Sequence, residues 1–238
     1  MERKKQIIRL TNYSLEVIHE LITQTPIYDL EKDGLVDNWS FKDHMAHLAH
    51  WLDRFNHRLI KRDKNYKEIT DTDKENARIW EQNHAVEWKL INTKLEKAYL
   101  DNIQHLRLLS EEDLGAKDIL YPPEDRPLWN SILDATCVHT ITHAGQIYNE
   151  RGNSRKSVEL LDKIFEDMQS LDPTPRWRGT NIYNMACLYT LSGNSEKALE
   201  LLRESFSLRP DLIEWSKKDT DLDTLRGNRS FIELMNVK

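Results

Sequence analysis

Residues 40–61 read SFKDHMAHLAHWLDRFNHRLIK, a stretch in which large apolar side chains recur every three or four positions. This spacing places them on one face of an α-helix. Ser40 directly precedes the first of them and Asp43 follows three positions later, so we expect Ser40 to cap the helix and Asp43 to lie beside its first backbone N–H groups. The predicted helix ends at about Lys61. Its apolar face consists of Phe41, Met45, Leu48, Leu52, Phe55 and Leu59.

The first half of the chain carries three further helical patterns. One covers residues 7–25, a second, long or interrupted, covers about residues 74–106, and a third covers about residues 129–152. Residues 115–128 contain three prolines and are expected to form a loop, because proline breaks a regular helix. Four helices with one or two long connections are typical of a bundle, so we predict a four-helix bundle over residues 1–152.

The composition agrees with helices and excludes several classes of protein. Of 238 residues, 39% are hydrophobic and 31% are charged, with only 7 Gly and 7 Pro, so an all-β sandwich or barrel is not expected. The net charge of −6 offers no basic surface for nucleic acid. No apolar run approaches the ~20 residues of a membrane span, and the first residues lack the apolar core of a secretory signal, so we expect a cytoplasmic protein with no membrane contact. Cys137 and Cys187 are expected to be reduced and packed against helices.

The second half of the chain contains an internal repeat with an offset of forty-one positions. Residues 152–161 (GNSRKSVELL) match residues 193–202 (GNSEKALELL) at seven of ten positions. The later copy resembles the tetratricopeptide repeat, which is a helical hairpin. We therefore predict an all-α protein in which a tetratricopeptide-like segment over residues 153–238 packs on the bundle and offers a surface to a protein partner. The residues that carry this resemblance are Met185, Ala186, Tyr189, Gly193, Ala198, Leu202 and Pro210.

Five of the nine histidines fall in two short clusters, and these clusters carry the chemical signal. His139 and His143 are one helical turn apart on one face, which is how a helix presents two imidazoles to one metal ion. The same spacing is compatible with two packed, half-buried side chains. A third imidazole from the helix over residues 40–61 would complete a site that still has an open coordination position, as catalytic metal sites need. The histidine cluster on that helix consists of His44, His47 and His50.

Two motifs resemble the DinB-like superfamily of four-helix bundles: residues 39–51 (WSFKDHMAHLAHW) and residues 139–147 (HTITHAGQI). The Trp-rich segment that includes Trp80 and Trp88 is similar to the branch of that superfamily that contains the ClbS/DfsB proteins. The resemblance covers roughly residues 1–152. It implies an up-down-down-up bundle, a homodimer and a divalent metal ion, zinc or nickel. The metal ligands that it implies are His47, His139 and His143.

Four other positions in these motifs are not implied to be ligands. His44 and His50 lie three residues on either side of His47, and we expect them to be solvated or to pack at the edge of the core, with a proton-shuttle role as the alternative. Thr142 and Ala144 stand where the closing motif of the superfamily commonly has a histidine and an arginine. The anion-binding arginine of that motif is therefore missing here.

A metal ion held by three histidines lowers the pKa of bound water to ~7 or activates a coordinated thiol. The sequence therefore predicts a metal-dependent hydrolase or a low-molecular-weight-thiol S-transferase that acts on a small electrophilic substrate, the second activity being known for thiol transferases and maleylpyruvate isomerase of the superfamily. Gln146 is the candidate for orienting water or substrate, with an inter-helix hydrogen bond as its alternative role. The competing prediction is a non-catalytic protein-interaction module with a structural metal ion or none.

Overall fold

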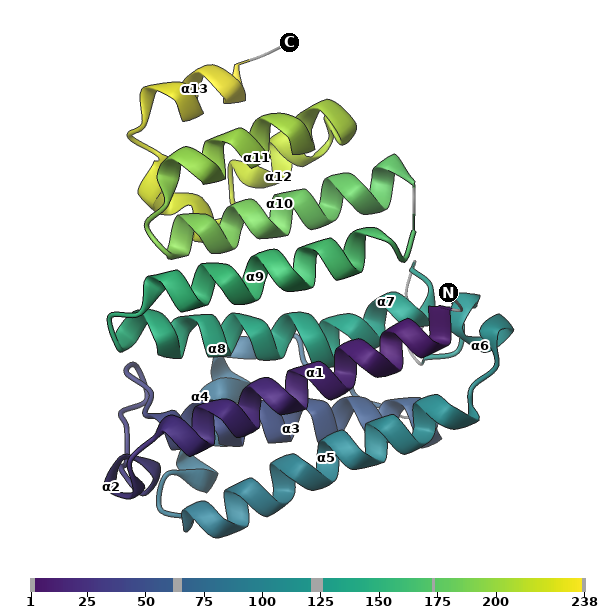
Figure 1. Ribbon diagram of the computed structural model, residues 1–238, viewed down its shortest axis with the longest axis vertical. Coiled ribbons are helices and arrows are strands. Elements are labelled where there is room, and N and C mark those ends of the chain that lie inside the picture. The colour runs from purple at the N-terminus through teal and green to yellow at the C-terminus, as the bar shows by residue number, and fades with distance from the viewer. Residues whose placement is uncertain (1–2, 62–65, 121–125, 173, 237–238) are drawn as a thin grey trace. The chain divides into compact units, whose positions relative to one another are not determined.

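A computed structural model describes residues 3–61, 66–120, 126–172 and 174–236 (Figure 1). Every regular element in these ranges is a helix, which confirms the all-α prediction. The chain divides into two compact units, Met1–Ala144 and Gly145–Lys238. This division falls inside a helix and precedes Gly152, the domain boundary that the sequence predicts. None of the described helices is both long and apolar enough to cross a membrane.

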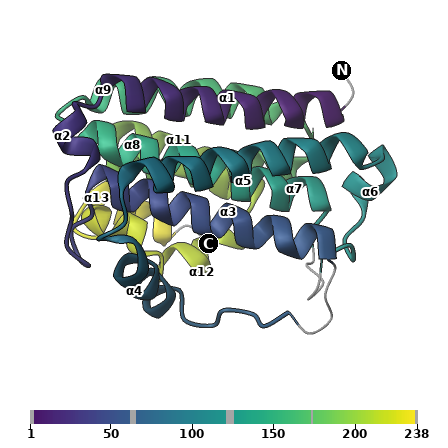
Figure 2. The same ribbon diagram turned by 90° about the horizontal axis from the view of Figure 1, so that it is seen from below.

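The first unit is built around four long helical segments (Figure 2). In this view α3 and α5 run in one direction, and α1 and the segment formed by α7 and α8 run in the other. These elements are α1 (Arg3–Gln24), α3 (Phe41–Lys61), α5 (Trp88–Leu108), α7 (Leu128–Leu133) and α8 (His139–Glu150), with a π-helical turn (Asp134–Val138) between the last two.

Helix α3 has the bounds that the sequence predicted, and the predicted capping is present. The backbone N–H and the hydroxyl of Ser40 both donate to Asp43 Oδ2, at 2.8 and 2.6 Å, while the backbone N–H of Asp43 donates to Ser40 Oγ at 3.3 Å. The backbone N–H of Gly34 donates to the same carboxylate oxygen at 3.0 Å. A Cβ at position 34 would lie 2.2 Å from that oxygen, so only glycine allows the preceding loop to approach so closely.

The long pattern over residues 74–106 is interrupted. It forms α4 (Thr72–Asn83) and α5, and the break coincides with Glu87, whose ψ of 138° is extended rather than helical. Two short helices, α2 (Ile27–Leu30) and α6 (Glu111–Gly115), complete the unit. The expected loop after residue 115 is seen in residues 116–120 and 126–127, whereas Pro122 and Pro123 lie outside the described residues.

Apolar side chains from all four long segments form the core of the first unit. A buried polar link also joins α3 to α5, because Asn102 Nδ2 donates to Asn56 Oδ1 and Asn56 Nδ2 donates to the carbonyl of Ala98, both at 2.7 Å. Cys137 is fully buried and is not part of a disulfide, as predicted. The largest of the fully buried side chains include Ile7, Leu10, Met45, Leu52, Ile91, Leu95 and Tyr99.

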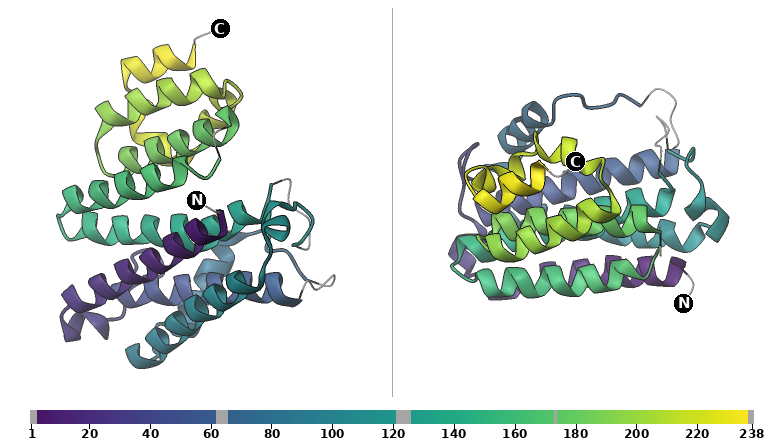
Figure 3. Two further views of the ribbon diagram at one scale, coloured as in Figure 1. Left: turned by 45° about the vertical axis from the view of Figure 1, so that its right-hand side comes forward. Right: turned by 90° about the horizontal axis from the view of Figure 1, so that it is seen from above.

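The second unit consists of helices that pack against their neighbours in the chain (Figure 3). In it α10 packs against both α9 and α11, and buried Ala186 and Ala198 let α10 and α11 come close together. Cys187, on α10, is buried and free, as predicted. The elements are α9 (Ser154–Gln169), α10 (Pro175–Leu191), α11 (Ser195–Leu208), α12 (Leu212–Ser216), a 3₁₀ helix (Thr220–Leu225) and α13 (Arg229–Met235).

The forty-one-residue repeat produces two turns with the same geometry. Gly152 and Gly193 both have a left-handed backbone, with φ of 73° and 80°. Asn153 and Asn194, which follow them, cap α9 and α11 by accepting a bond from the backbone N–H three residues later, at 3.3 and 3.2 Å. Each glycine ends one helix in a conformation that other residues rarely adopt, and each asparagine starts the next helix.

Candidate metal centre

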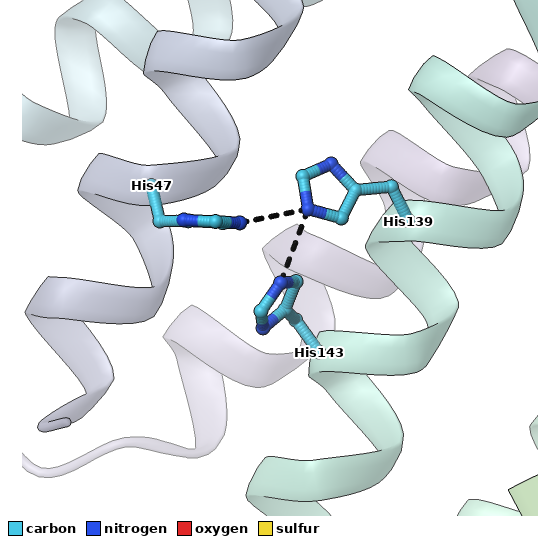
Figure 4. Close-up of side chains that lie close together, drawn as sticks. All are labelled: His47, His139 and His143. Atoms are coloured by element: carbon cyan, nitrogen blue, oxygen red, sulfur yellow. Dashed lines mark hydrogen bonds between the residues drawn. The ribbon is translucent and has the colours of Figure 1, made fainter. Parts of the chain in front are cut away.

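Two helices of the first unit bring three histidines together (Figure 4). His47 lies on α3, and His139 and His143 lie one turn apart on α8. Nε2 of His139 is 2.8 Å from Nε2 of His47 and 3.1 Å from Nε2 of His143. The three residues that the sequence motifs pointed to thus form a largely buried group that could bind a metal ion.

The π-helical turn directly before α8 sets the position of His139. The backbone N–H of His139 bonds to the carbonyl of Asp134, five residues earlier, instead of to the residue four positions back. The hydroxyl of Thr136 donates to the carbonyl of Ile132 at 2.8 Å within the same stretch. Such turns hold one more residue than an α-helical turn and occur often at functional sites.

The pKa values of His47 and His139 favour the neutral form that binds metals. Burial, together with neighbouring His139, His44 and His50, lowers the pKa of His47 from 6.5 to about 2. Burial lowers the pKa of His139 to about 4. These two rings are therefore neutral at pH 7, and each keeps a lone pair on one nitrogen.

Hydrogen bonding alone does not satisfy this arrangement. A ring nitrogen carries either one hydrogen or one lone pair, yet Nε2 of His139 faces Nε2 atoms of both other histidines. A single cation would instead use all three lone pairs at once. Adjacent nitrogens around tetrahedral zinc lie about 3.4 Å apart, for Zn–N bonds of about 2.0–2.1 Å, so small outward movements of the rings would fit the ion. The donor set therefore fits a divalent metal.

His44 also contacts the centre, whereas the sequence analysis expected it to be solvated or to pack at the edge of the core. Its Nδ1 lies 2.9 Å from Nδ1 of His143, and its side chain is buried. If His143 carries its proton on Nδ1 and donates it to His44, its Nε2 is left as a lone pair directed at the other two histidines. The spacing of His44, one turn before His47, was the signal that could have indicated a shared face.

Trp39 lies against the same group of rings. Its ring is 4.8 Å from that of His47, measured between centroids, and it stacks on His143 at 6.0 Å with an angle of 19° between the planes. The indole thus shields one side of the cluster. Nothing in its sequence position, directly before the cap of α3, distinguishes this role from ordinary packing.

The other two candidates, His50 and Gln146, are not members of the three-histidine group. Nε2 of His50 is 3.1 Å from a carboxylate oxygen of Glu75 on α4, so this ring lies against α4 beside the cluster. Burial lowers the pKa of His50 despite that carboxylate. Gln146 follows His143 by one turn and is half-buried, and its role in orienting water or substrate stays a prediction.

A cavity of about 470 Å³ reaches two of the three histidines, which gives the centre access for a small molecule. It extends along α3 and beside the π-helical turn. Its walls include His47, Trp51, Phe55, Ser131, Ala135 and His139.

A second group in the second unit also combines a thiol with carboxylates. Cys187, Asp219 and Asp221 have potential ligand atoms within 4.8 Å of one another. However, burial and the nearby Asp219 raise the pKa of the Cys187 thiol, and the hydroxyl of Tyr183 donates to Asp219 at 2.7 Å. The group is therefore a hydrogen-bonded cluster in which the thiol stays protonated.

Comparison of the chain with protein-family models, with curated proteins and with solved structures finds no match. Any function proposed for it therefore rests on its own residues.

Proposed function

We propose that this chain is a metal-dependent enzyme in which His47, His139 and His143 bind one divalent ion, with zinc or nickel as the metals that the sequence motifs imply. The observation that carries the proposal is the convergence of three Nε2 atoms, two pairs of them 2.8 and 3.1 Å apart, beside a cavity that His47 and His139 line. Three protein ligands leave a coordination position for a further molecule.

We also propose a finer description of the fold: a DinB-like bundle followed by tetratricopeptide-like hairpins. The opposed directions of the four long segments in the first unit support the first part. The matching turns at Gly152 and Gly193, and the close packing of α10 on α11, support the second.

The reaction that we propose is hydrolysis of a small electrophile, or transfer of a low-molecular-weight thiol to it. A bound divalent ion would supply Lewis acidity, which makes water or a thiol a better nucleophile near neutral pH. His44 holds the His143 ring in one orientation, and Trp39 excludes water from one side of the cluster. Gln146 is the proposed orienting group on α8.

The alternative is a non-catalytic interaction module in which the hairpins of the second unit bind a protein partner and the metal ion, if bound, is structural. Those repeated hairpins are the observation that favours it. The cavity beside His47 and His139 favours the enzyme, because a purely structural metal site has a closed shell of protein ligands and needs no access.

The test is turnover by the metal-loaded protein. A small activated ester and an aryl halide are offered, each with and without a low-molecular-weight thiol, to the wild type, to His143→Ala and to His57→Ala, whose histidine is exposed and pairs with Asp53. We expect turnover by the wild type and His57→Ala and a loss of at least a hundredfold in His143→Ala. Equal rates in all three proteins, or no turnover by the metal-loaded wild type, would overturn the enzymatic function.

A further inference from the structure

The cavity beside the metal centre has one aromatic wall. His47, Trp51 and Phe55 all line it, and they lie four residues apart along α3, so their side chains follow one another on one face of the helix. At 1.5 Å of rise per residue, the Cα atoms of Trp51 and Phe55 lie about 6 and 12 Å along the helix from that of His47. The rings of His47 and Trp51 meet, with their centroids 6.2 Å apart. A row of rings therefore leads from the proposed metal ligand along the cavity.

Small side chains line the cavity from the helical segment that carries the other metal ligands. Ser131, Ala135 and His139 belong to this wall and are also spaced four residues apart, from α7 through the π-helical turn to the start of α8. Serine and alanine are much smaller than tryptophan and phenylalanine, so this wall leaves space beside the aromatic row. The cavity volume of about 470 Å³ lies within the range of roughly 300–1,000 Å³ that is typical of small-molecule sites.

We propose that the substrate of this centre carries a flat aromatic group that lies against Trp51 and Phe55, with its reactive group at the histidines. This inference rests on the proposed function and names the chemical class of its substrate. Aromatic rings pack on one another in offset-stacked or edge-to-face arrangements, which strengthen binding by about two- to tenfold beyond the burial of the same apolar area. A saturated ring of similar size gains only from burial.

Both rings of the aromatic wall are held in place by the protein. The indole N–H of Trp51 donates to Asn76 Oδ1 on α4 at 3.2 Å. Phe55 is 9% exposed, so packing on its other sides fixes its ring. Rings that are already fixed lose little conformational entropy when a ligand binds, and this favours affinity.

Four charged side chains also line the cavity, and each contacts another group of the protein. Arg126 pairs with Asp134. The central carbons of the Arg54 and Arg58 guanidinium groups lie 4.5 and 5.5 Å from the centroid of the Tyr66 ring. Apolar atoms make up the larger part of the cavity wall. The surface that a ligand meets beside the histidines is therefore mainly apolar, and its largest side chains are aromatic.

The experiment compares two hydroxamic acids that bind zinc through the same group and differ only in their ring: phenylacetohydroxamic acid and cyclohexylacetohydroxamic acid. Acetohydroxamic acid, which has no ring, reports on the metal ion alone. Dissociation constants are measured by calorimetry with the zinc-loaded full chain. The saturated ring is the more hydrophobic of the two, so apolar burial alone would favour the cyclohexyl compound.

Two variants change the aromatic wall and one serves as the control. Trp51→Leu/Phe55→Leu keeps the wall apolar but removes both rings, and Trp51→Leu removes one. The matched control is Phe41→Leu/Trp88→Leu, because these two rings contact each other, with centroids 5.6 Å apart, and are not among the described lining residues of the cavity. Circular dichroism and zinc content are recorded for every protein.

We expect the wild type and the control to bind the phenyl compound roughly threefold or more tightly than the cyclohexyl compound. In Trp51→Leu/Phe55→Leu this preference should disappear, whereas the affinity for acetohydroxamic acid and the zinc content should stay unchanged. Trp51→Leu should reduce the preference and decides the test if the double variant loses its helicity. A wild type that binds the cyclohexyl compound as tightly as the phenyl compound, or a preference that survives in the variants, would overturn the inference.

A probe without a metal-binding group separates this inference from the proposed function. Binding of 2-naphthalenemethanol to the metal-free full chain is measured by saturation-transfer NMR, and Trp51→Leu/Phe55→Leu should weaken it roughly threefold or more. If the protein never takes up zinc, the metal centre is refuted and this measurement decides the aromatic subsite: binding that depends on the two rings supports it, and its absence overturns it. If zinc binds but the phenyl preference is absent, the metal centre stands and the subsite is refuted.

Discussion

Each of the three histidines at the centre is positioned by a different neighbour. His143 is held by His44, His139 by the π-helical turn that precedes it, and His47 by its place on α3 beneath the indole of Trp39. These supporting contacts determine whether the three lone pairs meet at one point. Removing one of these contacts should therefore change the affinity for the metal ion.

Replacing His44 with alanine should weaken zinc binding without abolishing it. The Nδ1–Nδ1 contact with His143 would be lost, and removal of such a supporting partner typically costs 10–100-fold in metal affinity. Competition with a chromogenic chelator measures the change. His57→Ala, which removes an exposed ring on the same helix, is the control and should retain wild-type affinity. Unchanged affinity in His44→Ala would contradict the supporting role.

The metal-free protein should lose stability as the pH falls below 6.5. Because the folded-state pKa values of His47 and His139 are lowered to about 2 and about 4, the unfolded chain takes up protons between pH 6.5 and 4 that the folded chain does not. The free energy of unfolding should then fall by roughly 1.4 kcal/mol per pH unit for each histidine.

Urea unfolding at pH 7, 6 and 5 in the presence of a chelator measures this dependence. His47→Gln removes one of the two groups and should reduce the slope by roughly 1.4 kcal/mol per pH unit. A slope identical to that of the wild type would show that His47 is not kept neutral by the fold.

At the scale of single residues, the sequence predicted the three converging histidines because each lies in a recognisable motif. It did not predict the contact between His44 and His143. The spacing of residues along one helix does not reveal which side chain of a second helix each of them meets.

At the scale of elements, the two equivalent turns of the second unit provide a test of the repeat. Gly193→Ala should destabilise the protein by about 1 kcal/mol, because a side chain at a φ of 80° is strained. Gly227→Ala is the control, as a Cβ there meets nothing within 4 Å and its backbone is not left-handed. Urea unfolding followed by circular dichroism compares the two. Equal stabilities would contradict the left-handed turn.

Apolar periodicity and capping residues were sufficient to predict most of the helices. Ser40 marks the start of α3, and Gly152 marks the end of α8. Both residues act on the backbone next to them, so the sequence alone reveals their effect. The break between α4 and α5 was left open, because no proline or glycine marks it. The π-helical turn was not predicted. One extra residue shifts the apolar pattern by one position, and α7 and α8 on either side of the turn are too short to reveal that shift.

At the scale of the whole molecule, metal binding should stabilise the fold. An ion that binds only the folded chain adds about 2.7 kcal/mol to the free energy of unfolding at a hundredfold excess over its Kd. Zinc should therefore raise the midpoint of thermal unfolding of the wild type. It should leave that of His139→Ala/His143→Ala unchanged, and an equal shift in both proteins would place the stabilising ion elsewhere.

The most direct test of the metal centre is the zinc content of the protein after incubation with zinc and gel filtration, measured by elemental analysis. We predict one zinc per chain in the wild type and in His19→Ala/His57→Ala, two histidines whose side chains are 50% and 57% exposed. We predict none in His139→Ala/His143→Ala with unchanged helicity. No zinc in the wild type, or one zinc per chain in all three proteins, would contradict the centre formed by His47, His139 and His143.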